Sequence, residues 1–150
     1  MKTPVIEKLH LPDLIENASK LAACGYLHIS KNNLLYLDID DQYIHQLFPF
    51  LQIPAVNKPN YFGISKAGAH VSVIYPEENI TIDAHDLYAQ HEFNIQGICS
   101  AELGLKKYYV LMVESPTLLQ IRKKYGLSDL LPFKGYWIGF HITIGKHKLV

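Results

Sequence analysis

Alternating polar and apolar side chains in residues 69–75 and 136–145 limit the possible folds of this chain more than any other feature. Successive side chains of a strand point to opposite faces of a sheet, so alternation predicts a strand with one buried face. In the first segment, His70 and Ser72 share one face, and apolar residues occupy the other. This segment therefore predicts a strand with a polar, reactive face.

The second segment predicts the final strand of the chain, because its two faces differ in character. One face is expected to carry Trp137, Gly139, His141, Thr143 and Gly145, and the other Tyr136, Ile138, Phe140, Ile142 and Ile144. The second set is apolar and aromatic, which predicts that it faces the core. The glycines near His141 are expected to leave room for a ligand to approach the backbone.

Helical spacing of apolar residues predicts a helix over residues 11–23, ended by Gly25. A second helix is expected from Asp40 or Asp41 to about residue 51. Pro49 lies inside that pattern and is expected to end or kink the helix.

Further strands are expected over residues 26–30, 34–39, 92–103 and 107–114, followed by a helix capped by Ser115, and residues 54–68 are expected to be irregular. Strands outnumber helices, and the connections are short. This combination predicts an α+β fold with largely antiparallel sheet, formed by residues 1–150 as a single domain.

Charge and composition exclude several classes of protein. The 150 residues include 14 basic and 14 acidic side chains, so the formal net charge is zero. Long nucleic acids are usually held by many lysine and arginine contacts to phosphate, which argues against a long duplex as partner but not against a nucleotide or an RNA end. Cys24 and Cys99 match no disulfide or zinc pattern and are expected to be reduced.

The chain shows no sign of secretion or membrane insertion. Its N-terminal residues have no continuous apolar run, and no segment approaches the roughly 20 apolar residues of a membrane span. We therefore expect a cytoplasmic protein with no membrane partner, and a monomer is favoured.

Two histidines, each followed by a hydroxyl residue two positions later, suit phosphodiester cleavage. One neutral imidazole takes a proton from the attacking water or sugar hydroxyl, and the other, protonated, gives a proton to the leaving oxygen. An ordinary imidazole pKa of about 6.5 makes both states accessible near neutral pH. Hydroxyls such as those of Ser72 and Thr143 can donate to the non-bridging phosphate oxygens, and the scheme requires no metal or other cofactor.

A single match to His-x-Ser/Thr has little specificity. The chain contains 8 histidines, and His28-Ile29-Ser30 gives a third match. The alternative interpretation of any one match is a strand histidine that is hydrogen-bonded in or near the core. For His28 this structural interpretation is favoured.

The motifs Gly-Ala-His70-Val-Ser72-Val and Gly-Phe-His141-Ile-Thr143-Ile-Gly, with the helix that begins at Ser115, resemble the two-histidine (2H) phosphoesterase superfamily, which includes RNA 2′,3′-cyclic phosphodiesterases of the LigT type. The resemblance is carried by residues 68–76 and 107–146. It implies two lobes of antiparallel sheet with flanking helices around a central cleft. It also implies that His70 and His141 are the acid/base pair, that Ser72 and Thr143 hold the phosphate, and that no metal is used.

Other residues near the motifs are candidates for substrate binding. Tyr75 and Trp137 are candidates for stacking on a base, although core packing is an equally open interpretation. Lys146 and Lys66 flank the motifs and are candidates for attracting phosphate, with solvated surface lysines as the favoured alternative.

A metal site is an alternative for the segment Asp83-Ala-His85-Asp86 with His91-Glu92, which contains metal-ligand residue types. The spacing matches no metal-ligand pattern on a helix, so a polar surface loop is expected instead.

The sequence therefore predicts a metal-independent phosphodiesterase that acts on a cyclic (2′,3′-type) or linear phosphodiester of an RNA end or small nucleotide. One alternative is a non-catalytic module that binds a nucleotide or RNA end on the same fold. A weaker alternative is a purely structural domain, in which the two histidines would lie far apart or be buried separately. Which histidine acts as the base and which as the acid stays open.

Overall fold

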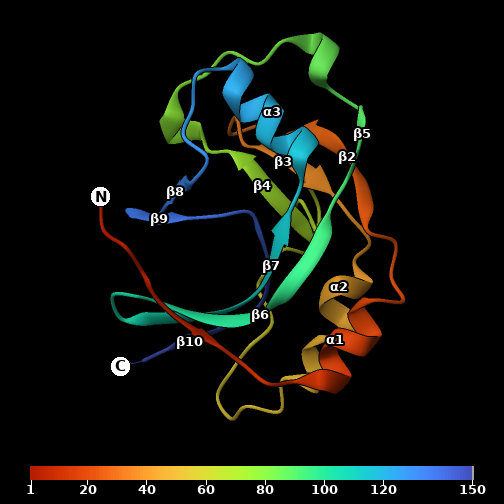
Figure 1. Cartoon of the computed structure of the whole chain (residues 1–150), viewed down its shortest axis with the longest axis vertical. Coiled ribbons are helices and arrows are strands. Elements are labelled where there is room, and N and C mark those ends of the chain that lie inside the picture. Colours follow the sequence, from red (N-terminus) through yellow and green to blue (C-terminus); the bar gives the residue numbers. More distant parts are fainter. Residues whose placement is uncertain (150) are drawn as a thin grey trace.

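A computed structural model describes residues 1–149 of the chain, which form antiparallel sheets with a few short helices (Figure 1). The prediction of an α+β fold is therefore confirmed. No helix in the described residues is both long and apolar enough to cross a membrane.

The first sheet contains the first and the last strand of the described chain and has the strand order β1-β6-β7-β10. Its strands are β1 (Val5–Lys8), β6 (Asn94–Leu103), β7 (Lys106–Glu114) and β10 (His141–Lys148). The hairpin of β6 and β7 turns at Gly104, where φ is +64° and glycine is favoured because it lacks a Cβ atom. This strand pair agrees with the sequence prediction, whereas β1 was not predicted.

The second sheet has the strand order β4-β3-β2-β5 and lies in the upper part of Figure 1. Its strands are β2 (Cys24–Ile29), β3 (Leu35–Asp38), β4 (His70–Ile74) and β5 (Gln90–Glu92). Leucines and valines of β2, β3 and β4 are buried at alternate positions, and the polar residues between them lie on the opposite face. This alternation in β4 matches the sequence prediction.

The first two helices are shorter than periodicity predicted, whereas the helix capped by Ser115 agrees with the prediction. They are α1 (Pro12–Ala18), α2 (Gln42–His45) and α3 (Pro116–Lys124), with 3-10 turns at η1 (Phe48–Phe50), η2 (Pro76–Glu78) and η3 (Ala84–Asp86). The prediction that Gly25 ends the first helix was wrong, because Gly25 lies within β2. A Cβ atom there would come within 2.1 Å of the carbonyl oxygen of Asp38, so the close approach of β2 and β3 requires glycine.

The predicted final strand is divided into two strands that belong to different sheets. β9 (Tyr136–Ile138) pairs with β8 (Leu131–Phe133), and β10 begins after Gly139 and Phe140. The prediction of one continuous strand was therefore wrong, because the chain leaves one sheet and enters another between Ile138 and His141. β10 is also buried on both faces, with His141 and Thr143 each 6% exposed.

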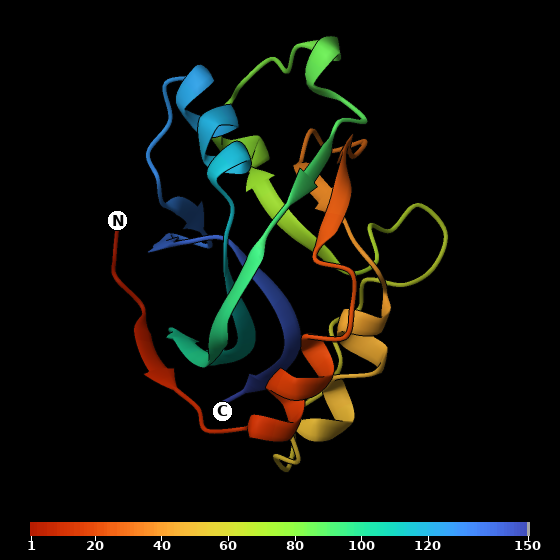
Figure 2. The same cartoon turned by 45° about the vertical axis from the view of Figure 1, so that its right-hand side comes forward.

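The two four-stranded sheets meet along the strands that carry the histidine motifs. β4 ends the order of the second sheet, β10 ends the order of the first, and the two strands are in contact. Figures 1 and 2 show β10 and β4 converging in the middle of the molecule. Because the motifs lie on these edge strands, side chains from two distant parts of the sequence face a common space.

Candidate active site

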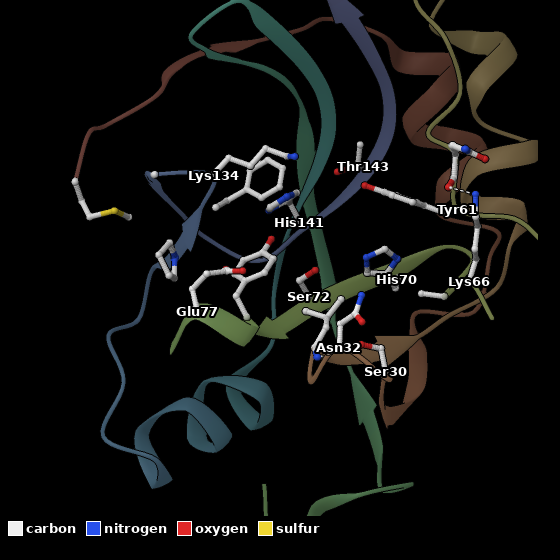
Figure 3. Close-up of a pocket in the computed structure, with 18 residues that line it drawn as sticks. Ser30, Asn32, Tyr61, Lys66, His70, Ser72, Glu77, Lys134, His141 and Thr143 are labelled. Carbon is white, nitrogen blue, oxygen red and sulfur yellow. Dashed lines mark hydrogen bonds between the residues drawn. The ribbon is translucent and has the colours of Figure 1, made fainter. Parts of the chain in front are cut away.

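A cavity of about 730 Å³ lies where the two sheets meet, and both histidine motifs line it. His70 and Ser72 enter it from β4, and His141 and Thr143 enter it from β10 (Figure 3). A volume of this size falls in the range typical of small-molecule sites. The geometry contradicts the weaker alternative, in which the histidines would be far apart or buried separately.

The two histidines are held in the same way. His70 Nδ1 lies 2.7 Å from the carbonyl oxygen of Gly68, and His141 Nδ1 lies 2.9 Å from that of Gly139. A carbonyl oxygen only accepts, so Nδ1 donates a proton in each case, and the neutral imidazole keeps an unprotonated Nε2. Each ring therefore presents a basic nitrogen, as a proton-transfer group requires.

His141 has the more apolar surroundings of the two. Its ring lies 5.3 Å from the ring of Phe133, centroid to centroid, and its side chain is buried. Burial lowers the pKa of His141 to about 4, the hydrogen bond to the Gly139 carbonyl opposes this shift, and the charge of His70 adds to it. His141 is consequently neutral in the free protein near pH 7.

His70 lies close to two tyrosine rings and to a carboxylate. The ring centroids of Tyr61 and Tyr36 lie 4.8 and 5.7 Å from that of His70, and Asp38 is its partner in the β3–β4 register. Burial lowers the pKa of His70, while the hydrogen bond to Gly68 and the charge of Asp38 raise it in part. His70 thus has a negative charge nearby that favours its protonated form, which His141 lacks.

Each motif hydroxyl is accompanied by a tyrosine hydroxyl. Tyr61 directs its hydroxyl toward Thr143 (Figure 3). Tyr75 makes the corresponding contact with Ser72. Burial raises the pKa of both tyrosines, and these contacts lower it in part. Both phenols therefore stay protonated near neutral pH and can donate hydrogen bonds to an anion.

The single arginine has a structural position behind β4. Arg122 is fully buried and donates to both carboxylate oxygens of Glu78, at 2.8 and 2.9 Å, and to the carbonyl oxygen of Val73, at 2.8 Å. Glu78 also accepts a hydrogen bond from the backbone N–H of Tyr75, at 2.9 Å. This ion pair joins α3 to the end of β4 and fixes the position of Tyr75, so Arg122 is not directed at the cavity.

The cavity rim carries charges of both signs. Lys66 and Lys134 line it, as does Glu77 (Figure 3). The Lys66 ammonium donates to the carbonyl oxygen of Asn60 at 3.3 Å, which leaves other donor positions on the same nitrogen. The lysines favour an anion at the cavity mouth.

The remaining residues singled out from the sequence have mixed positions. Tyr75 and Lys66 line the cavity, but Trp137 and Lys146 are not among its lining residues.

Gly145 leaves no room for a ligand, contrary to the sequence prediction. A Cβ atom at Gly145 would come within 2.6 Å of Val56, so the 51–57 segment fills that space.

The third His-x-Ser match and the possible metal-binding segment supply no histidine or carboxylate to the cavity. His28 is half-buried on the polar face of the second sheet, with its Nε2 4.0 Å from Asp38, and is not itself a lining residue. The Asp83–Asp86 segment forms an exposed 3-10 turn in which both carboxylates pair with Lys124. Among residues 1–149, no group of three or more His, Cys, Asp or Glu side chains is placed to hold a metal ion.

Two residues that contact the histidines lie in segments for which the sequence predicted neither a strand nor a helix. Tyr61 lies in the irregular 54–68 segment, and Phe133 lies in β8, which was not predicted. Neither segment shows a regular alternation or helical spacing that would assign its side chains to a face. Only the contact between the sheets brings both rings to the histidines.

Fold and cavity together define an α+β protein in which two histidine–hydroxyl pairs from separate sheets share one cleft. A family model described as the Swiss Army Knife 2H phosphoesterase domain matches residues 35–149. The chain therefore belongs to the 2H phosphoesterase superfamily, which supports phosphodiester hydrolysis as its general activity. Searches of curated proteins and of solved structures gave no match.

Proposed function

We propose that this protein hydrolyses a cyclic (2′,3′-type) or linear phosphodiester, on an RNA end or a small nucleotide, by metal-independent acid/base catalysis. The observation that carries the proposal is the shared cavity, in which His70 and His141 each bond a glycine carbonyl through Nδ1. That arrangement leaves Nε2 of each ring as the proton-transfer atom.

The surroundings favour His70 as the acid and His141 as the base. Asp38 beside His70 favours the protonated form, whereas the burial of His141 against Phe133 favours the neutral form. In the proposed step, His141 removes a proton from the attacking water. The water oxygen forms a bond to phosphorus, and His70 gives its proton to the leaving oxygen as the P–O bond to that oxygen breaks.

The hydroxyls supply the electrostatic part of the mechanism. Ser72 and Thr143 donate to the non-bridging oxygens as negative charge builds there, and Tyr75 and Tyr61 orient these donors. An anionic phosphoryl group between the imidazoles also favours proton uptake by His70, because opposite charges stabilise each other in a buried site.

The proposal is tested by assaying purified protein with nucleoside 2′,3′-cyclic phosphates and with a linear phosphodiester, in the presence of EDTA. We expect activity to persist in EDTA and to fall by about 10²–10⁴-fold in His70→Ala and in His141→Ala, the usual contribution of one proton transfer. Loss of activity in EDTA, or full activity in both variants, would contradict it.

A non-catalytic binding module is the second candidate, because desolvation lowers the pKa of both imidazoles and so disfavours the protonated form that an acid requires. It predicts that a nucleoside monophosphate binds while no cyclic or linear ester is turned over. Calorimetric binding measured beside the activity assay separates the two candidates.

A further inference from the structure

The polar face of the second sheet continues from the cavity as a row of aromatic rings. We define the aromatic face as His28, Tyr36 and Tyr88. The ring centroids of Tyr36 and His70 are 5.7 Å apart, those of His28 and Tyr36 are 6.0 Å apart, and those of Tyr88 and His28 are 5.2 Å apart. The row therefore begins at a cavity histidine and ends outside the cavity.

The strand register explains this row. His28 of β2 is paired with Tyr36 of β3, and Tyr36 is paired with Ser72 of β4. Figure 2 shows the three strands side by side. Paired residues of neighbouring strands point to the same side of a sheet, so the aromatic face and the Ser72 hydroxyl share one surface. The opposite side of these strands carries the buried core.

Core packing does not account for the outer end of the row. Tyr88 is 69% exposed, and the His28 side chain is 36% exposed. Tyr88 also has φ of +66°, a conformation that is uncommon and strained for a bulky residue. Its N–H donates to the Leu27 carbonyl at 2.7 Å, so backbone bonding to β2 holds the ring beside His28.

The chemistry of this surface fits a base better than a phosphate. Its charged strand residue is Asp38, a carboxylate that repels phosphate, and its rings offer flat apolar area. Nucleobases stack on aromatic side chains with little dependence on sequence, and stacking of this kind is the usual basis of single-strand binding. The lysines that suit phosphate lie instead at the cavity, at Lys66 and Lys134.

We infer that the aromatic face is a second subsite, which stacks a base of a single-stranded oligonucleotide whose phosphodiester lies between His70 and His141. This inference rests on the proposed function. Of the two proposed substrate classes, an RNA end and a small nucleotide, it selects the end of a nucleotide chain. β2 lies two interstrand spacings from β4, roughly 10 Å, so the subsite is next to the reacting group and separate from it.

The test compares a nucleoside 2′,3′-cyclic phosphate with a trinucleotide that ends in the same group. Tyr88→Asn removes the ring and keeps a residue that tolerates positive φ, while Tyr88→Phe keeps the ring. Val5→Asn is the matched control, because Val5 is 67% exposed on β1, at the edge of the first sheet opposite β10.

We expect Tyr88→Asn to raise KM for the trinucleotide about tenfold, the effect of losing one stacked base. Its kcat and its activity on the mononucleotide are expected to match those of Tyr88→Phe and Val5→Asn. An unchanged KM for the trinucleotide, or an equal effect on both substrates, would overturn the subsite.

Binding separates this inference from the proposed function. A labelled trinucleotide ending in a 3′-phosphate is titrated with each variant and followed by fluorescence anisotropy. If no substrate is hydrolysed but Tyr88→Asn weakens this binding about tenfold, the subsite stands and the hydrolase proposal fails. If hydrolysis is observed and binding is insensitive to Tyr88, the hydrolase proposal stands and the subsite fails.

Discussion

The ring of Tyr61 lies 4.8 Å from the imidazole of His70, centroid to centroid, and its hydroxyl is directed at Thr143. This one side chain therefore contacts both histidine motifs, which come from different sheets. The segment that carries it is fixed at both ends. Asn57 exchanges two backbone hydrogen bonds with Lys146 of β10, each 2.9 Å, and the Tyr61 carbonyl accepts from the Gly68 N–H at 2.8 Å.

Tyr61→Phe should lower kcat/KM about tenfold, because it removes a hydroxyl that orients Thr143 while leaving the ring against His70. Steady-state kinetics on a cyclic nucleotide measure the change. Thr143→Val and the double variant complete a double-mutant cycle, in which the second substitution adds little to the first. Fully additive effects would show that the two hydroxyls act independently.

Gly68→Ala should destabilise the fold and lower kcat, because Gly68 has φ of +69° and a Cβ atom there would lie 2.5 Å from Asp41. The left-handed conformation alone costs about 1–2 kcal/mol for a residue with a Cβ atom. The carbonyl of Gly68 also holds His70, so its displacement should affect catalysis. Urea unfolding and kcat measure both effects.

Gly139→Ala is the matched control for that variant. Gly139 holds His141 in the same way, but a Cβ atom there meets Met112 at 3.6 Å, which is ordinary contact. Its effect on the free energy of unfolding should stay within about 0.5 kcal/mol. Equal losses in the two glycine variants would contradict the explanation from backbone conformation.

The free energy of unfolding should rise with pH between about 4 and the ordinary histidine pKa. The pKa of His141 is about 4 in the folded protein because of burial, so in this window the unfolded chain binds a proton that the folded protein does not. The contribution of His141 is on the order of 3 kcal/mol, fully present above the window and lost as the pH falls through it. Burial lowers the pKa of His70 too, which acts in the same direction.

Urea unfolding of the wild type and of His141→Asn at pH 4.5 and pH 7 measures this contribution. The variant should show a clearly smaller gain in stability across the interval than the wild type. His10→Asn, at an exposed position, serves as the control and should match the wild type. An unchanged gain in His141→Asn would mean that His141 is not buried in its neutral form.

Asp38→Asn should move the alkaline limb of the kcat/KM profile to lower pH. If His70 is the acid, activity falls as His70 loses its proton, and removing the Asp38 charge lowers the pKa of His70 further. Asp13→Asn, an exposed carboxylate in α1, is the control and should leave the limb in place. An unmoved limb in Asp38→Asn would instead favour His70 as the base.

Arg122→Met should destabilise the protein by about 3–5 kcal/mol, because it leaves the Glu78 carboxylate buried without a partner. The pair is 0% and 8% exposed, so solvent cannot replace the lost contact. Unfolding in urea gives the loss. Adding Glu78→Gln should recover part of it, and a loss below about 1 kcal/mol in Arg122→Met alone would show that the ion pair has no structural role.

Local patterns predicted the parts of the fold that depend on neighbours in sequence. The alternation in residues 70–74 correctly predicted that His70 and Ser72 share one face. The β6–β7 pair was predicted from the turn that connects the two strands. Patterns failed where the cause lies elsewhere in the chain. Gly25 was interpreted as a helix end, because the neighbouring sequence does not indicate that the carbonyl of Asp38 packs against it.

The sequence by itself identified the residues of the two histidine motifs. It also determined which side chains of β4 face away from the core. Side-chain direction in a strand follows from backbone geometry, which is local. Only the tertiary structure decided that the edges of two sheets meet, that Tyr61 and Phe133 pack on the histidines, and that His141 is buried. Burial and contact between sheets depend on segments tens of residues apart, so the spacing of residues within one strand carries no record of them.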